Sequence, residues 1–218
     1  MSKANAPTKA DRGNETRELI LGTAERLFAE RGVTAVSNRQ ISDAAGQFNN
    51  FVVGYHFGTK TDLVLAIARR HNAVTEGRRQ EMLTQLTASS DLREWVACLI
   101  KPVTEHLAAM GNPSWYARFA AQITTDPALR QIVIDEAVAS PSMQQTIDGI
   151  SQHLSVLPEQ VRQERADMSR QLLVHTCAER ERALHDGRAV PRATWEAVAT
   201  GLIDATAGLW LAPFTATS

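Results

Sequence analysis

The feature that most constrains this chain is a pair of helix-capping sequences around two short apolar segments. Ser37 and Gln40 fit the capping box, in which two side chains three residues apart satisfy free backbone amides at a helix start. Thr59 and Asp62 repeat the pattern after the second apolar segment. Gly46 interrupts the apolar segments between them. The pattern therefore predicts two short helices joined by a tight turn, which is the helix-turn-helix arrangement.

The remaining sequence predicts helices only, because no segment alternates apolar and polar residues with β-branched enrichment. Helices are expected over residues 15–31, 37–46, 49–57, from 59 onward, 91–110, 158–187 and 191–213, with further starts at the pairs Asn112-Pro113, Asp126-Pro127 and Ser140-Pro141. We expect an all-α protein with a disordered N-terminal arm (1–14), a three-helix helix-turn-helix domain (15–62) and a larger helical ligand-binding and dimerisation domain (63–218).

Composition sets broad limits on the class of protein. The chain has 218 residues, of which 44% are hydrophobic and 22% charged, as in ordinary globular proteins. Residues 1–60 hold eight Lys or Arg against six Asp or Glu, whereas the remainder is acidic, which is consistent with a DNA-facing end or with chance. The N-terminus lacks the apolar stretch of a signal peptide, and residues 197–214 suit a packed helix better than a membrane span. Cys98 and Cys177 are interpreted as reduced, packed thiols of a cytoplasmic protein.

The segment Tyr55-His56-Phe57-Gly58-Thr59-Lys60-Thr61-Asp62-Leu63, together with Gly32, Ile41 and Ala45-Gly46, resembles the DNA-binding domain of TetR-family transcriptional regulators. The resemblance covers about residues 15–65. It implies a homodimer that binds double-stranded DNA, with Tyr55 and Lys60 on phosphates. The turn Gln47-Phe48-Asn49-Asn50 is one residue longer than usual in the family, which affects the assignment of base-reading residues.

The segment 49–57 must present one face to its own core and the other to the major groove. Val53 and Phe57 share the predicted inner face, and Phe48 is expected to plug the turn. Asn50, Phe51, Gly54 and Tyr55 are then predicted to point outward. Phe51 suits a thymine methyl group or a second core or interface position, and both interpretations stay open.

Polar candidates complete the predicted DNA site. Asn49 is expected to cap its helix, and Asn50 could pair with adenine, bond a phosphate or act as a local cap. Gly54 would allow close backbone approach to DNA, or is merely tolerated. Tyr55, His56, Thr59 and Lys60 suit the phosphate backbone, although His56 could instead be a packed residue. Arg39 could reach a phosphate or a guanine edge, or be an exposed structural arginine.

The last helix predicts a dimer interface. Gly201, Ala205, Gly208 and Ala212 form a stripe of small residues that would let helices approach closely. Larger apolar residues flank this stripe or lie on the preceding long helix: Leu172, Trp195, Val198, Leu202 and Leu209. A helix with two apolar stripes packs on its own domain and on a second surface. The alternative is that both stripes belong to the core of one chain.

Aromatic, Met and polar residues between helices predict a ligand site, because ligand sites in helical bundles lie there. The candidates are Trp95, Cys98, His106, Met110, Trp115, Tyr116, Phe119, Met143 and His175. Each of them could instead be ordinary core.

These observations favour a ligand-responsive repressor that binds a palindromic operator as a homodimer and is released by a small, mostly apolar effector. The alternative is an activator or a ligand-independent regulator of the same fold. The sequence lacks a nucleophile turn, a Cys/His metal spacing and a phosphate-binding glycine loop, so we expect no enzyme, no metal and no cofactor.

Overall fold

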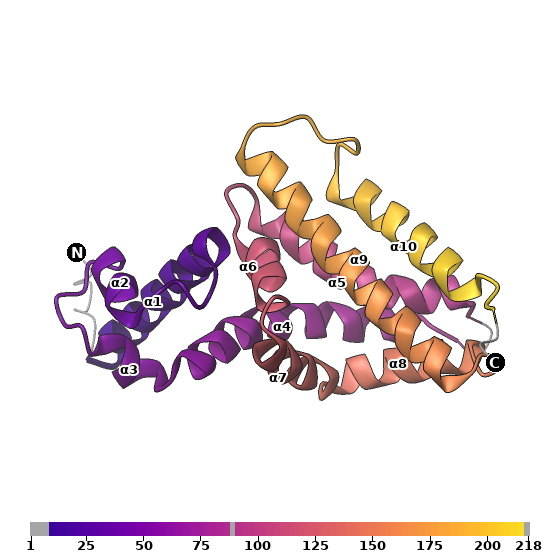
Figure 1. Ribbon diagram of the computed structural model, residues 1–218, viewed down its shortest axis with the longest axis horizontal. Coiled ribbons are helices and arrows are strands. Elements are labelled where there is room, and N and C mark those ends of the chain that lie inside the picture. Colours follow the sequence, from indigo (N-terminus) through magenta and orange to yellow (C-terminus); the bar gives the residue numbers. More distant parts are fainter. Residues whose placement is uncertain (1–8, 88–89, 216–218) are drawn as a thin grey trace, which may run out of the picture.

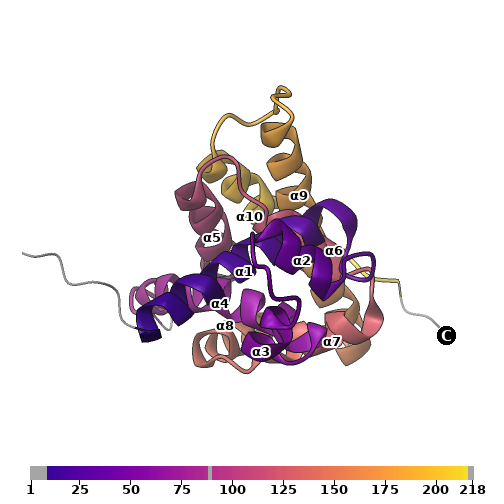
Figure 2. The ribbon, with the colours of Figure 1, turned by 90° about the vertical axis from the view of Figure 1, so that its left-hand side faces the viewer.

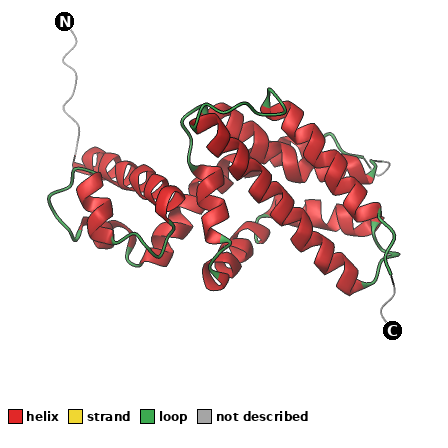
Figure 3. Ribbon diagram, turned by 45° about the horizontal axis from the view of Figure 1, so that its top comes forward, coloured by secondary structure: helices red, strands yellow, loops and turns green. Residues whose placement is uncertain are grey.

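The computed structural model describes residues 9–87 and 90–215, which form α-helices and no strand (Figure 3). The all-α prediction is confirmed for these residues. The helices are α1 (Lys9–Arg31), α2 (Asn38–Ala44), α3 (Val52–Phe57), α4 (Lys60–Leu83), α5 (Leu92–Met110), α6 (Tyr116–Ile123), α7 (Pro127–Val138), α8 (Pro141–His153), α9 (Glu159–His185) and α10 (Trp195–Leu211).

The helices form two groups that α4 connects. Figure 1 shows α1, α2 and α3 at one end of the molecule and the larger group, including α9 and α10, at the other. Turned so that the small group faces the viewer, α1, α2 and α3 lie in front of the other helices (Figure 2). α4 packs against α1 and α3 near its start and against α5, α7 and α8 further along. One continuous helix therefore belongs to both groups.

The small group has its own core, formed by the predicted inner face. Val53 and Phe57 of α3 pack with Phe28, Ile41 and Ala45, as the helical spacing predicts. The core continues past residue 62, since the start of α4 and two residues of α6 belong to it: Leu63, Val64, Ile67, Phe119 and Ile123. The small group is thus anchored on the larger one through α4 and α6.

Several helix boundaries differ from the predictions. Residues 1–8 of the expected arm lie outside the described part of the chain, but residues 9–14 are helical rather than disordered, since α1 begins at Lys9. Extending an existing helix by a turn is easier than nucleating one, and Asp11 in the first turn suits the positive helix end. α10 begins at Trp195 rather than Pro191, with the Thr194 hydroxyl accepting the N–H of Ala197 at 3.1 Å.

α6 also begins later than predicted, at Tyr116 instead of Pro113. The carboxylate of Glu181 on α9 accepts the backbone N–H groups of Arg118 at 2.9 Å and Ala117 at 3.3 Å. It also accepts the Ser114 hydroxyl at 2.7 Å. The free amides at the start of α6 are therefore satisfied by a side chain from another helix, and not by a local cap.

The larger group buries a second core between α5, α8, α9 and α10. Both cysteines are buried, and burial raises the pKa of the Cys177 thiol to about 12. Trp95 of α5 lies against Gly149 of α8 so closely that a Cβ on Gly149 would meet the indole at 2.2 Å. Among the described helices, none combines the length and apolar character needed to cross a membrane.

Candidate DNA interface and the helical body behind it

Local hydrogen bonds fix the backbone on both sides of α3. The Ser37 hydroxyl accepts the N–H of Gln40 at 3.2 Å, and the Gln40 side chain accepts the N–H of Ser37 at 2.8 Å. Thr59 and Asp62 form the same reciprocal pair at the start of α4, and these hydrogen bonds from Thr59 lower the pKa of Asp62. Both predicted capping boxes are confirmed.

α3 divides its side chains between the core and solvent. Val53 and Phe57 are buried, whereas Phe51 is 83% exposed and Tyr55 is 86% exposed. Gly54 is exposed on α3, and Asn50 is exposed in the turn before it; the ideal Cβ position of Gly54 has nothing within 4 Å. A short helix anchored on one side and open on the other is the geometry of a recognition helix that enters the major groove.

Two predictions for the turn before α3 are wrong. Phe48 does not plug the turn but is fully exposed, because Ala45, Val53 and Phe57 already form the core on this side. Asn49 does not occupy the helix-capping position, which falls to Phe51. The side-chain oxygen of Asn49 instead accepts the N–H of Phe51 at 2.9 Å and so stabilises the turn.

The polar candidates lie around this helix with different surroundings. Arg39 is exposed on α2 and pairs with Asp43 at 3.8 Å. His56 is half-buried between the rings of Tyr55 and Phe57. The Lys60 ammonium donates to the carbonyl of Val33 at 3.2 Å, a structural contact that the sequence did not indicate.

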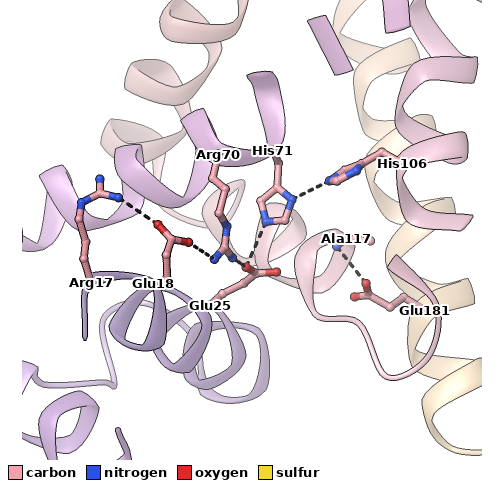
Figure 4. Close-up of polar contacts among 8 residues, drawn as sticks. All are labelled: Arg17, Glu18, Glu25, Arg70, His71, His106, Ala117 and Glu181. Carbon is pink, nitrogen blue, oxygen red and sulfur yellow. Dashed lines mark hydrogen bonds and ion pairs between the residues drawn. The ribbon is translucent and has the colours of Figure 1, made fainter. Parts of the chain in front are cut away.

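A chain of polar contacts connects α1 with the larger group of helices (Figure 4). Glu25 of α1 is 3% exposed and pairs with the guanidinium of Arg70. Its carboxylate also lies 3.0 Å from Nε2 of His71, and Nδ1 of His71 lies 2.7 Å from Nε2 of His106 on α5. With Glu25 as acceptor, His71 donates from Nε2 and accepts from His106 at Nδ1. Glu18 adds a longer, exposed contact with Arg70 at 3.6 Å.

The surroundings keep His106 neutral. Burial is the main cause that lowers the pKa of His106 to about 4, and the neighbouring His71 contributes to the same shift. The ring of Tyr116 stacks on His71 with centroids 3.9 Å apart, and burial raises the pKa of Tyr116 to about 12. The roles of Glu25 and His71 were not predicted from the sequence. Both lie at helical spacing from apolar core residues, Leu21 and Ile67, which is a signal for buried polar groups.

The predicted ligand residues do not line one cavity. Tyr116 and Phe119 border a mostly apolar cavity of about 170 Å³ between α4, α6, α7 and α9. Met143 borders a more polar one of about 220 Å³ between α4, α7 and α8. Trp95 borders a third, between α5 and α8. His175 is exposed on α9 and borders a groove with α10.

The other ligand candidates lie within the helical packing. His106 is part of the polar chain described above, and Cys98 is buried, with its carbonyl accepting Nε of Arg79 at 3.1 Å. Trp115 stacks with the Arg118 guanidinium at 4.2 Å. Met110 is half-buried at the end of α5. Among the described residues, no group of His, Cys, Asp or Glu has the arrangement of a metal site.

The predicted dimer residues separate into buried and open positions. Val198 and Leu202 belong to the chain's own core, and Trp195 packs under the Arg180 guanidinium at 4.9 Å. Ala205 and Gly208 are exposed. Ala205 borders a groove of about 710 Å³ between α9 and α10, together with Leu172 and Gly201. Leu209 is half-buried on the same helix.

The fold and the N-terminal motif together define a helix-turn-helix protein with a helical body. Residues 20–67 match the family model for bacterial regulatory proteins of the tetR family. Among curated proteins, the chain is similar to the HTH-type transcriptional repressor AcnR of Corynebacterium glutamicum, 27% identical over 139 residues, or 59% of this chain and 64% of the relative. The AcnR of Corynebacterium diphtheriae is 28% identical over 127 residues, 56% of this chain and 60% of that protein. The alignments thus span less than two thirds of these relatives.

Solved structures match over most of the chain and show the same fold. A TetR-family regulator from Marinobacter aquaeolei VT8 aligns with a TM-score of 0.58 at 15% identity, over 92% of this chain and 96% of that one. AmtR of Mycobacterium smegmatis aligns with a TM-score of 0.55 at 18% identity, over 94% and 89%. The chain therefore shares the fold of these regulators, and its residues 20–67 match the tetR family model.

Proposed function

We propose that this chain is a transcriptional repressor that binds a palindromic operator as a homodimer and leaves it when a small, mostly apolar effector binds. The observation that carries the proposal is the two-sided character of α3 and the turn before it. Val53 and Phe57 lie in the core, whereas Tyr55 on α3 and Asn50 and Phe51 just before it are open to solvent. The curated relatives are named as repressors, which favours repression over activation. A bacterial repressor acts on the chromosome, so the proposal includes a cytoplasmic location. The proposed role is binding of DNA and effector and involves no catalysis.

The dimer is proposed to form through α9 and α10. One recognition helix contacts few base pairs, whereas two copies on a two-fold axis read both halves of a palindrome. Ala205 and Gly208 are exposed on one face of α10 and would let a partner helix approach closely, whereas Gly201 on the same helix is covered by the side chain of Arg192 from its own chain. Leu172 extends this face onto α9. Val198 and Leu202 support the face from beneath, since they are buried in the same chain.

The effector is proposed to enter beside Tyr116 and Phe119. The cavity there has about 170 Å³, less than the roughly 300–1,000 Å³ of typical ligand pockets. An effector that needs more space binds better to a conformation in which the surrounding helices have moved apart, and it shifts the population toward that state. Ala68 and Asn72 of α4 border the cavity, so this displacement would involve α4.

The polar chain offers a route from this cavity to the DNA-binding helices. Tyr116 borders the cavity and stacks on His71, which in turn contacts Glu25 on α1. A shift of Tyr116 or α4 would disturb a hydrogen bond that the N-terminal group of helices depends on. Binding of the effector would then lower the affinity for the operator, and binding of the operator would lower the affinity for the effector by the same factor.

The test begins with selection of preferred duplexes from random DNA by the purified chain, followed by footprinting of genomic DNA. We expect a palindromic site overlapping a promoter and two chains per site in sedimentation. A footprint upstream of a promoter, with increased transcription, would favour activation. A monomer that prefers no duplex at moderate salt would refute the proposal.

A further inference from the structure

Two phenylalanines project into solvent where the α2–α3 turn meets the recognition helix. Phe48 is 106% exposed and Phe51 is 83% exposed, whereas Phe28, Phe57 and Phe119 are buried. Exposed phenylalanine forgoes the free energy that burial of its ring would contribute to folding. These two side chains therefore do little for the stability of the domain that carries them, and their exposure calls for a binding role.

The backbone that carries the two rings is held in place. The side-chain oxygen of Asn49 accepts the N–H of Phe51 at 2.9 Å, which fixes the turn between Phe48 and α3. Val53 and Phe57 anchor α3 in the core behind it. The rings are therefore presented from a defined position, and binding would not require the turn to fold first.

We propose that Phe48 and Phe51 select operator DNA by contacting the C5 methyl groups of thymines in the major groove. This inference rests on the proposed function and names the sequence chemistry that the site reads. Among the four bases of DNA, thymine presents a methyl group at the major-groove edge, and apolar side chains contact it there. The rings adjoin the exposed face of α3 within residues 20–67, the segment matched by the regulator family.

The neighbouring groups favour DNA over a protein partner as the occupant. Asn50 and Tyr55 are exposed beside the rings and can bond base edges or phosphates, and Gly54 leaves room for close approach of the helix. Together these residues provide two apolar contacts within a polar surface. A protein-binding site would be expected to show a continuous apolar centre.

The test replaces thymine by deoxyuridine, which keeps base pairing and removes only the methyl group. The operator is first selected from random duplexes with the full-length chain, and each thymine of a half-site is then replaced symmetrically in both halves. Burial of one methyl group corresponds to about fourfold in affinity, so removal of a contacted pair of methyls should weaken binding by about fifteenfold. Fluorescence anisotropy at constant salt measures each Kd.

Variants assign the contacts to the rings. Phe51→Ala and Phe48→Ala should bind the unmodified operator more weakly, and each should become insensitive to deoxyuridine at one thymine position. Phe214→Ala is the matched control, because Phe214 is also exposed but follows α10, which ends at Leu211. It should keep the wild-type affinity and the full sensitivity to the missing methyls.

Three results would overturn the inference. Equal affinity for every deoxyuridine operator would show that no methyl group is read. Retained sensitivity in both Phe variants would assign the methyl contacts to other residues. A change of oligomeric state in these variants, with operator affinity intact, would identify a protein interface. Failure of the wild type to prefer any duplex would refute the proposed function itself, and is thereby distinguished from failure of the inference alone.

Discussion

Replacing Glu25 by glutamine should destabilise the protein far more than the small change in shape suggests. The substitution keeps the size of the side chain and removes its charge. Glu25 is 3% exposed and serves two donors, the Arg70 guanidinium and Nε2 of His71 at 3.0 Å. A glutamine offers one oxygen acceptor, and its NH₂ group would face a donor.

The magnitude follows from these two contacts. A hydrogen bond to a charged group contributes about 1.5–3 kcal/mol, and breaking a buried ion pair costs about 3–5 kcal/mol. Arg70 is 32% exposed and keeps its contact with Glu18, so it recovers part of the loss in solvent. We therefore expect the free energy of unfolding to fall by about 3 kcal/mol. At about 2–4 °C per kcal/mol for a chain of this size, Tm should fall by about 6–12 °C.

The assay is thermal unfolding followed by circular dichroism, without DNA or effector. Glu18→Gln is the matched control, because Glu18 contacts the same Arg70 but is largely exposed, and exposed pairs contribute about 1 kcal/mol or less. If Glu25→Gln lowers Tm no more than Glu18→Gln does, the buried contacts of Glu25 with Arg70 and His71 do not stabilise the packing of α1 against α4.

Three further predictions concern other groups. His106 has a pKa lowered to about 4 by burial, against about 6.5 in the unfolded chain, so protons favour unfolding and stability should fall between pH 6.5 and pH 4. In urea unfolding, His106→Gln should lose about 2–3 kcal/mol less than the wild type between pH 7 and pH 4.5, and parallel losses would contradict this. Lys60→Ala should weaken binding to all duplexes alike and lower the salt slope by about one per subunit, whereas an unchanged slope would leave Lys60 only its bond to Val33. The Cys177 thiol, with a pKa raised to about 12, should resist thiol reagents at pH 8 until the chain is unfolded; rapid labelling of native protein would contradict its burial.

The parts of the fold that follow local rules could be predicted from the sequence. The capping boxes of α2 and α4 and the inner face of α3 depend only on residues within a few positions of each other. The start of α6 depends on Glu181, more than sixty residues away, and no local pattern indicates it. The prediction for the turn before α3 failed for a similar reason, since the core position expected for Phe48 is already filled by Ala45, Val53 and Phe57.

The functional residues divide in the same way. The outward positions of Phe51 and Tyr55 follow from helical spacing, but the ligand residues required knowledge of how α4 to α9 pack. Aromatic residues suit a core and a cavity equally well, so type and spacing could not separate Phe119, which borders a cavity, from Trp115, which stacks with the Arg118 guanidinium. The contact between Glu25 and His71 joins positions 46 apart in the chain and arises only in the folded state.

The position of α4 gives the polar chain a meaning beyond stability. Apolar contacts are non-directional and tolerate small displacements, whereas a hydrogen bond weakens steeply once its geometry changes. A shift of α4 would therefore leave the core around Ile67 nearly intact while breaking the contact from His71 to Glu25. If this contact transmits the effector signal, Glu25→Gln should weaken the mutual effect of effector and operator more than it weakens operator binding alone. Equal losses in both quantities would leave Glu25 a purely structural residue.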